Sequence, residues 1–465
     1  MVRLNDDVPA QPEGDAVDED WITGWAEADG VRVPLPRGWA PVGPDAGVPV
    51  VGAQVALHAT PVASDADGTP FAPTIVVTFV DAHPDASAAA FGAQALAAAV
   101  EVCGAATGDG RVLGYEVWLP PAQPDRVDAG RRLSFAHRRE AATLAVTQVV
   151  RVVDRPAGRG VLTVTATVPA LHRLTHAADV DRVAAAVEVR ADRPAGPPAA
   201  TPPAPPTVAV TPTVEVEDVR ALVPRQPFTT AGPRVARAAF EEFLRRRKVG
   251  PRRAGHADLL AAGLVDADGR PTPDGTAVRE LLRTRSAHLR LESARGPVPL
   301  SLDVSHRGGR ALVVATAGPA DVPVPGGAVA APEVLGEATR VRLDWVDASH
   351  LPVVLAAWSG LEPRWVAAAT AAPSEEDLLR RVDDPDAPHP PDADEGLRRA
   401  WAGDWYLWTM RLAGQPVGRV VVRAGDGGSW LLTGASGLGE PAARQWVPAA
   451  LAQDLDRFTL ALVLA

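Results

Sequence analysis

Three carboxylates share one polar turn, VDADGRPTPD, which stands between two stretches of helical spacing. Asp266, Asp268 and Asp274 could offer oxygen ligands to a calcium ion, which prefers such groups. A calcium-binding EF loop, however, needs glycine at its sixth position, and counting from Asp266 places Pro271 there. The pattern therefore favours a scaffold turn, in which aspartates bond the local backbone and glycine takes a positive φ.

One pair among the ten histidines, His172 and His176, has the spacing of a helix face. A zinc-binding HExxH helix needs glutamate beside the first histidine, and Arg173 occupies that position. We therefore predict that the pair consists of ordinary helix histidines with no metal between them.

The segment GASGL, from Gly434 to Leu438, comes near the G-x-S-x-G elbow of serine hydrolases but has leucine where the second glycine belongs. The single cysteine, Cys103, stands in AAAVEVCGA without a nearby base, which favours a small buried residue over a reactive thiol. The sequence contains no P-loop and no G-x-G-x-x-G after a strand-like run. We therefore predict no catalytic residues, no metal and no cofactor, and expect that the protein is not an enzyme.

Tryptophan is concentrated toward the end of the chain, with eight of the 12 beyond residue 340. In WAGDWYLWTM the three indoles share a face if the segment is helical, whereas in a strand Trp405 and its neighbour Tyr406 point apart. Two interpretations remain open. The rings fill the core, as aromatic side chains commonly do, or they form a protein-binding surface, because tryptophan is enriched among interface hot spots. The candidate binding residues are Trp401, Trp405, Trp408 and Trp430.

Length and composition predict a folded chain with more than one domain. The 465 residues exceed one ordinary core, and the 46% hydrophobic and 22% charged residues are close to globular averages. A net charge of -11 argues against nucleic-acid and anionic-membrane surfaces, since both attract clustered positive charge. The acidic start does not read as a signal peptide, and no apolar run reaches the roughly 18 residues of a membrane span. We expect a cytoplasmic protein without membrane insertion.

Changes in composition divide the chain into two bodies. Residues 1–20 are acidic, poor in apolar side chains and expected to be disordered. The proline-rich stretch DRPAGPPAATPPAPPTVAVTPT, residues 192–213, predicts an extended and semi-rigid linker, because proline removes backbone donors and restricts φ. This linker separates a body at residues 21–191 from a second body at residues 214–465.

Each body is predicted to be α+β, with a mainly antiparallel sheet and packed helices. In the first, ATLAVTQVVRVVD and RGVLTVTATVPA flank a RPAGR turn and predict a hairpin, while DASAAAFGAQALAAAVEVCG predicts a helix capped by Asp85 or Ser87. In the second, PLSLDVSHRGGRALVVATAG predicts a hairpin that turns at Gly308 and Gly309, and SEEDLLRRV predicts a helix that begins at Ser374. The run SHLPVVLAAWSGL fits either a strand or a short helix.

Two stretches of the second body resemble the EspG family of type VII (ESX) secretion-associated proteins. The first is LLAAGLVDADGRPTPDGTAVRELLRTRSAHLRLES, in which a helix ending in a small-Gly-Leu-Val pattern leads through a polar turn into a helix and a strand. The second is PVGRVVVRAGDGGSWLLTGASG, which precedes a terminal helical run. The resemblance covers roughly residues 220–465, and this chain lacks the clear opening strand and the leading Trp/Leu segment of that family.

The first body resembles the PsbP/Mog1-like fold of actinobacterial LpqN-type proteins. VRVPLPRGW, PTIVVTFVDA, TLAVTQVVRVVD and GVLTVTATVPALHRL stand in the order of that fold, over about residues 28–190. This resemblance implies a fold, and a fold alone does not determine function.

The EspG resemblance implies a non-enzymatic cytosolic chaperone or adaptor. Such a protein binds the exposed apolar tip of a helical secretion substrate, with an apolar, aromatic-rich sheet face covering that tip. The alternative is a structural or docking component of a secretion or envelope assembly. Both interpretations expect a protein partner and no nucleic acid.

Overall fold

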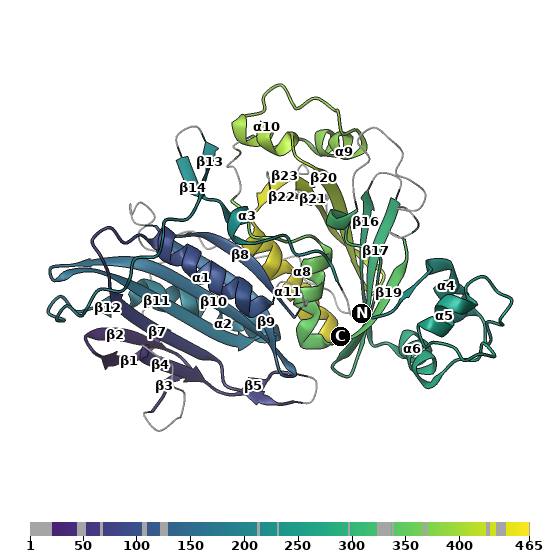
Figure 1. Cartoon of the computed structure of the whole chain (residues 1–465), viewed down its shortest axis with the longest axis horizontal. Coiled ribbons are helices and arrows are strands. Elements are labelled where there is room, and N and C mark those ends of the chain that lie inside the picture. The colour runs from purple at the N-terminus through teal and green to yellow at the C-terminus, as the bar shows by residue number, and fades with distance from the viewer. Residues whose placement is uncertain are drawn as a thin grey trace.

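Two large antiparallel sheets organise the chain in a computed structural model (Figure 1). The α+β class predicted for the chain is confirmed. The structure describes residues 21–43, 53–65, 68–104, 109–120, 129–211, 214–229, 232–295, 298–322, 336, 339–365, 369, 371–424, 428–433 and 443–464. The acidic segment 1–20, for which disorder is predicted, and the GASGL segment both lie outside these residues.

The first sheet has seven strands. Their spatial order is β3 (Trp39–Pro41), β4 (Ala53–Ala59), β7 (Thr74–Asp81), β11 (Gly158–Pro169), β10 (Ala142–Arg155), β9 (Gly130–Arg139) and β8 (Gly110–Trp118). The predicted hairpin is present as β10 and β11, which stay in register from Leu144 opposite Pro169 to Arg155 opposite Gly158. Two-residue alternation of buried and half-buried side chains along β7 shows which face of the sheet is packed.

Helices and a small sheet cover the two faces of the first sheet. Helix α1 (Ala88–Cys103) begins at Ser87, whose hydroxyl accepts a hydrogen bond from the Ala90 amide, and packs Leu96 and Ala99 onto β8 and β9. On the other face lie α2 (Arg173–Ala186), which follows a short 3-10 turn at Ala170–His172, and a three-stranded sheet. That sheet contains β1 (Ile22–Ala28), β2 (Val31–Pro36) and β12 (Glu188–Val189), and a two-stranded ribbon is formed by β5 (Val62–Ala63) and β6 (Pro70–Phe71).

The proline-rich segment is attached to the first sheet along its path. The Ala199 amide donates to the Asp81 carbonyl, and the Gly196 amide donates to the Asp81 carboxylate at 2.7 Å. The segment then enters a small hairpin of β13 (Thr207–Thr211) and β14 (Val214–Glu217), followed by the single turn α3 (Val219–Leu222). The amides of Gly196 and Ala199 thus attach the segment to the sheet, whereas its prolines have no N–H to donate.

The second sheet has nine strands. Their order is β15 (Arg234–Val235), β19 (Val341–Asp347), β18 (Arg310–Ala315), β17 (Val298–Arg307), β16 (Ala287–Arg295), β20 (Trp405–Leu412), β21 (Gln415–Ala424), β22 (Ser429–Thr433) and β23 (Ala443–Trp446). The predicted turn between β17 and β18 is confirmed, because Gly308 and Gly309 both have positive φ, at 59° and 79°. Two successive residues with positive φ characterise the hairpin turn whose twist matches that of the strands.

Two groups of helices cover opposite ends of one face of this sheet. Helices α4 (Arg237–Arg245), α5 (His256–Ala261) and α6 (Pro273–Thr284) form an apolar cluster with β15, β18 and β19. Helices α9 (Glu375–Asp383) and α10 (Glu395–Trp401) pack on β20 to β22. Figure 1 shows the first group at the right edge of the molecule and the second at its top. Short 3-10 turns occur at Pro319–Asp321 and Ala348–His350.

One hydrophobic core joins the two sheets. Helices α8 (Leu351–Trp358) and α11 (Pro448–Leu464) lie between the sheets in Figure 1. Their side chains share a single buried cluster with β16 to β18 of the second sheet and with Leu113 and Ala136 of the first. The run SHLPVVLAAWSGL is therefore a helix, and it is apolar on almost every side because both sheets bury it. The bodies predicted from composition are thus packed together.

Candidate protein-binding surface

The four candidate tryptophans are all buried, each with at most 7% of its surface exposed. Trp401 lies on α10 and Trp405 on β20, with ring centroids 5.1 Å apart, and Trp430 belongs to the same apolar cluster. Trp408 lies on the opposite face of β20, in the core between the sheets. The structure thus brings three of the four together and separates the fourth, since alternate residues of a strand face opposite ways.

Their burial fits the core-filling interpretation and leaves no indole free to contact a partner in this conformation. The Trp401 Nε1 donates to the Ala387 carbonyl at 2.8 Å, and the Trp405 Nε1 donates to the Ala400 carbonyl at 2.7 Å. These bonds fix the rings beneath the α9–α10 region. The tryptophans therefore lie beneath the surface and support it. Side chains other than the tryptophans are the ones exposed to a partner.

The apolar face of the second sheet is covered by the chain itself, through α8, α11 and the first sheet. The opposite face, between the two helical groups, is polar where β16, β17 and β20 cross it. His288 lies 3.0 Å from Asp303, Arg290 lies 2.9 Å from Glu292, and Arg411 lies 3.2 Å from the same glutamate. The apolar, aromatic-rich sheet face expected from the EspG resemblance does not occur among these described strands.

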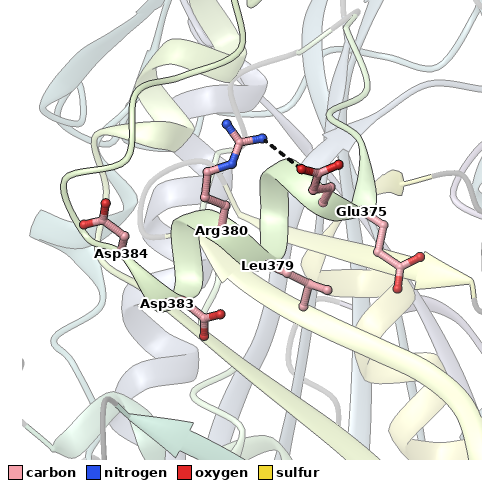
Figure 2. A pocket seen from close by; sticks show the side chains of 6 residues that line it. Glu375, Leu379, Arg380, Asp383 and Asp384 are labelled. Atoms are coloured by element: carbon pink, nitrogen blue, oxygen red, sulfur yellow. Dashed lines mark ion pairs between the residues drawn. The ribbon is translucent and has the colours of Figure 1, made fainter.

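Helix α9 carries a shallow surface recess of about 700 Å³ (Figure 2). Four carboxylates, one arginine and one leucine line it: Glu375, Glu376, Asp383, Asp384, Arg380 and Leu379. The leucine is 39% exposed, whereas the preceding Leu378 is fully buried. Successive residues of a helix are about 100° apart, so on a helix that packs along one side only, the residue after a fully buried one turns away from the core. The second one therefore lies on the outer face, among the carboxylates.

Local sequence explains why α9 forms where it does. The Ser374 hydroxyl accepts from the Asp377 amide at 3.1 Å, as the capping pattern predicts, and three acidic residues occupy the first turn. Arg381 fastens the helix to its support, because its Nε donates to the Trp401 carbonyl at 3.0 Å and its guanidinium lies 5.5 Å from the centre of the Trp405 ring. Burial lowers the pKa of Arg381, while neighbouring Asp404, Asp384 and Asp386 act in the opposite direction.

The charge of the recess is negative. Arg380 is the one cation among its described lining residues, and it already pairs with Asp377 at 2.6 Å and with Glu376 at 4.0 Å. In Figure 2, Leu379 lies between Asp383 and Glu375, and Asp384 lies on the far side of Arg380. An exposed apolar side chain in a recess lined mainly by carboxylates is complementary to an apolar side chain flanked by lysine or arginine.

The residues weighed for metal binding do not assemble a site among the described residues, where no group of three His, Cys, Asp or Glu side chains could hold an ion. Asp266 accepts from the Arg270 amide at 2.8 Å, and Gly269 has φ 80°. The turn chemistry predicted for this segment is confirmed.

The two histidines with helix spacing lie at the start of α2, where His176 packs edge-on against Trp39 with ring centroids 5.3 Å apart. Burial lowers the pKa of His172, and the neighbouring His176 lowers it further.

Cys103 is fully buried at the end of α1. Its thiol donates weakly to the Ala136 carbonyl at 3.6 Å. Burial raises its pKa to about 12, against a smaller opposing effect of Arg111. The predicted burial of the cysteine is confirmed. Burial also disfavours the thiolate, which is the nucleophilic form of the side chain.

Sequence reasoning did not identify the α9 recess. The signal was present in SEEDLLRRVDD, where paired leucines within a short acidic helix leave one of them exposed. The tryptophan-rich stretch predicts a binding surface at other residues, because residue type alone does not give a side chain's position on a helix or strand.

No family model matches the chain, and no curated protein matches it. Among solved structures, part of the chain is similar to cyanobacterial PsbP (CyanoP) from Synechocystis sp. PCC 6803, at 14% identity and a TM-score of 0.25, covering 39% of this chain and 100% of that one. It is also similar to LpqN, involved in cell envelope biogenesis of Mycobacterium tuberculosis, at 17% identity and a TM-score of 0.20, covering 32% of this chain and 78% of that one.

A third similar structure is the Ran-binding protein Mog1p of Saccharomyces cerevisiae, at 13% identity and a TM-score of 0.20, covering 34% of this chain and 82% of that one. Part of the chain thus has the PsbP/Mog1-like likeness predicted from its sequence, and no function follows from it. Across the described residues, the helices lack the combination of length and apolar character that crossing a bilayer requires.

Proposed function

We propose that this protein is a non-enzymatic adaptor that binds another polypeptide through the α9 recess. The observation that carries the proposal is Leu379, an exposed leucine in a recess that four carboxylates also line, on a helix that Arg381 holds in place. A preorganised helix face loses little entropy on binding, so a small apolar contact with a charged rim is sufficient for recognition.

The partner that fits this surface is a helical segment with an apolar tip and basic residues beside it. An adaptor for helical substrates of a type VII secretion system, acting in the cytoplasm, is the specific form of the proposal. It is supported by the resemblance of residues 220–465 to the EspG family and by the charge of the recess. The recess would cover the apolar tip of the substrate until the secretion machinery receives it.

The experiment is co-expression with the helical-hairpin proteins encoded beside the gene, followed by a binding measurement on purified components. We expect a stable complex with at least one of them. Leu379→Asp should weaken the dissociation constant at least tenfold, because it places a fifth carboxylate where an apolar contact is required. Failure with every neighbouring hairpin protein would refute the adaptor proposal.

Leu244 supplies a matched control. It is 40% exposed on α4, another nine-residue amphipathic helix that lies outside the recess. Leu244→Asp should leave the dissociation constant unchanged. Equal losses for the two variants would show that the α9 recess is not the binding surface. If the protein co-purified with the secretion machinery and not with a soluble substrate, the alternative of a docking component would be favoured.

A further inference from the structure

A small cavity of about 240 Å³ lies where three segments meet. Strand β8 of the first sheet supplies Arg111, and the segment that follows the β13–β14 hairpin supplies residues 220–226. The loop after α8 supplies residues 361–364. The cavity therefore borders both of the bodies that share the central core, and it is separate from the α9 recess.

Arginines dominate its lining. Arg111, Arg220, Arg225 and Arg364 all line the cavity, and Glu362 is the one acidic residue among the described lining residues. Arg364 lies 2.5 Å from Glu362, and Arg225 lies 2.8 Å from Asp321, just outside the lining. The lining itself has a formal excess of three positive charges, which Asp321 and Asp218 beside it reduce to one.

Arg111 anchors the floor of the cavity. It is 3% exposed, its Nε donates to the Leu361 carbonyl at 2.8 Å, and its Nη1 donates to the Gln226 carbonyl at 3.1 Å. These bonds tie β8 to both of the other segments. They also hold a guanidinium, which stays charged at all ordinary pH values, at the back of a partly enclosed space.

Arginine side chains of like charge lie close together in this cavity. Burial lowers the pKa of Arg220, and the neighbouring Arg364 lowers it further, against smaller opposing effects of Glu362 and Asp218. A multiply charged anion between these groups would convert repulsion into attraction. The guanidinium fork also matches tetrahedral oxyanions, to which it donates two parallel hydrogen bonds.

We infer that this arginine cavity binds a small tetrahedral oxyanion of the phosphate class. Its volume corresponds to roughly eight water molecules, enough for a phosphate with part of its hydration shell but below the usual range for larger organic ligands. The inference does not depend on the adaptor proposal, because it concerns another surface and another ligand. A bound anion would contact all three segments and so stabilise the packing of the two bodies.

The test measures the thermal unfolding midpoint of the full chain against inorganic phosphate, with sodium chloride holding the ionic strength constant. We expect a saturable rise in the midpoint, and calorimetry should give one site per chain. Arg220→Gln should weaken the apparent phosphate affinity about tenfold or more, since it removes one charge-assisted contact without disturbing the buried Arg111. A phosphate monoester such as glycerol phosphate, in a parallel titration, distinguishes a free anion from an esterified one.

Arg245→Gln is the control, because Arg245 is a strongly exposed arginine on α4, outside the cavity lining. It should retain the full effect of phosphate. The inference is overturned if phosphate gives no shift beyond that of chloride, if the shift does not saturate, or if Arg220→Gln and Arg245→Gln respond alike. Folding of both variants in the absence of phosphate is checked by the same unfolding curves.

Discussion

Arg173 of α2 and Asp456 of α11 form a buried ion pair across the boundary between the two bodies, with the Arg173 Nε donating to the carboxylate at 2.5 Å. They are 7% and 6% exposed. Thr143 and His350 meet across the same boundary at 3.2 Å. Polar contacts thus accompany the shared apolar core, and they have consequences for stability that can be measured.

The first prediction concerns pH. Burial raises the pKa of Asp456 to about 6, although Arg173 and Arg457 oppose the shift. Because the folded protein binds a proton at this group more tightly than the unfolded chain, the contribution of Asp456 lowers the free energy of unfolding as pH rises from about 4 to about 6. Asp456→Asn should remove this component. Urea unfolding of both proteins across pH 4–7 measures it, and identical pH profiles would contradict the assignment.

The second prediction concerns the other partner of the pair. Arg173→Gln leaves a buried carboxylate without its cation and should lower the free energy of unfolding by about 3–5 kcal/mol at pH 7. Arg245→Gln, which removes one partner of the exposed Arg245–Glu241 pair on α4, should cost less than about 1 kcal/mol. The double variant R173Q/D456N should recover part of the loss. Denaturant titration would refute the prediction if the two arginine variants were equally stable.

The third prediction concerns the attachment of the proline-rich segment. Glu217 of β14 is almost fully buried, accepts from Tyr115 at 3.0 Å and lies 2.5 Å from the Arg131 Nε. Glu217→Ala should speed amide hydrogen exchange in β13 and β14 by about a hundredfold or more, because removing one partner of a buried pair costs about 3 kcal/mol. Exchange measured by mass spectrometry is compared with Glu215→Ala, an exposed neighbour that should leave exchange unchanged.

The fourth prediction separates packing from recognition on α9. Leu378→Ala should lower the free energy of unfolding by about 2–5 kcal/mol, since it leaves a cavity beneath the helix, whereas Leu379→Ala should change it by less than about 0.5 kcal/mol. Partner affinity should respond mainly to the second substitution. Chemical denaturation and calorimetry on the same two variants measure both effects. A stability loss at Leu379 equal to that at Leu378 would show that both leucines are structural.

Features specified by short stretches were predictable from the sequence. The β10–β11 hairpin, the glycine turn at Gly308 and the Ser374 cap each depend on residues within a few positions of one another. The helix at Leu351–Trp358 was ambiguous, because burial on all sides removes the periodicity that distinguishes helix from strand. No local pattern indicates that α11 packs against Leu113, since that contact joins residues more than three hundred positions apart.

The candidate site was less accessible to sequence reasoning than the fold. Tryptophan type alone does not distinguish a ring that supports a surface from one that forms it, and the difference for Trp401 and Trp405 depends on how α9 and α10 pack over β20. The arginine cavity draws on three segments that are brought together only by the shared core.

The order of synthesis adds a constraint of its own. The ribosome produces the strands of both sheets before it produces α11, the helix that fills the space between them. At ordinary elongation rates, on the order of tens of seconds separate the synthesis of the first sheet from that of α11, which covers its inner side. Until then Leu113 and Ala136 lack this cover, so a nascent chain of this protein is itself a candidate for protection by the general folding machinery of the cell.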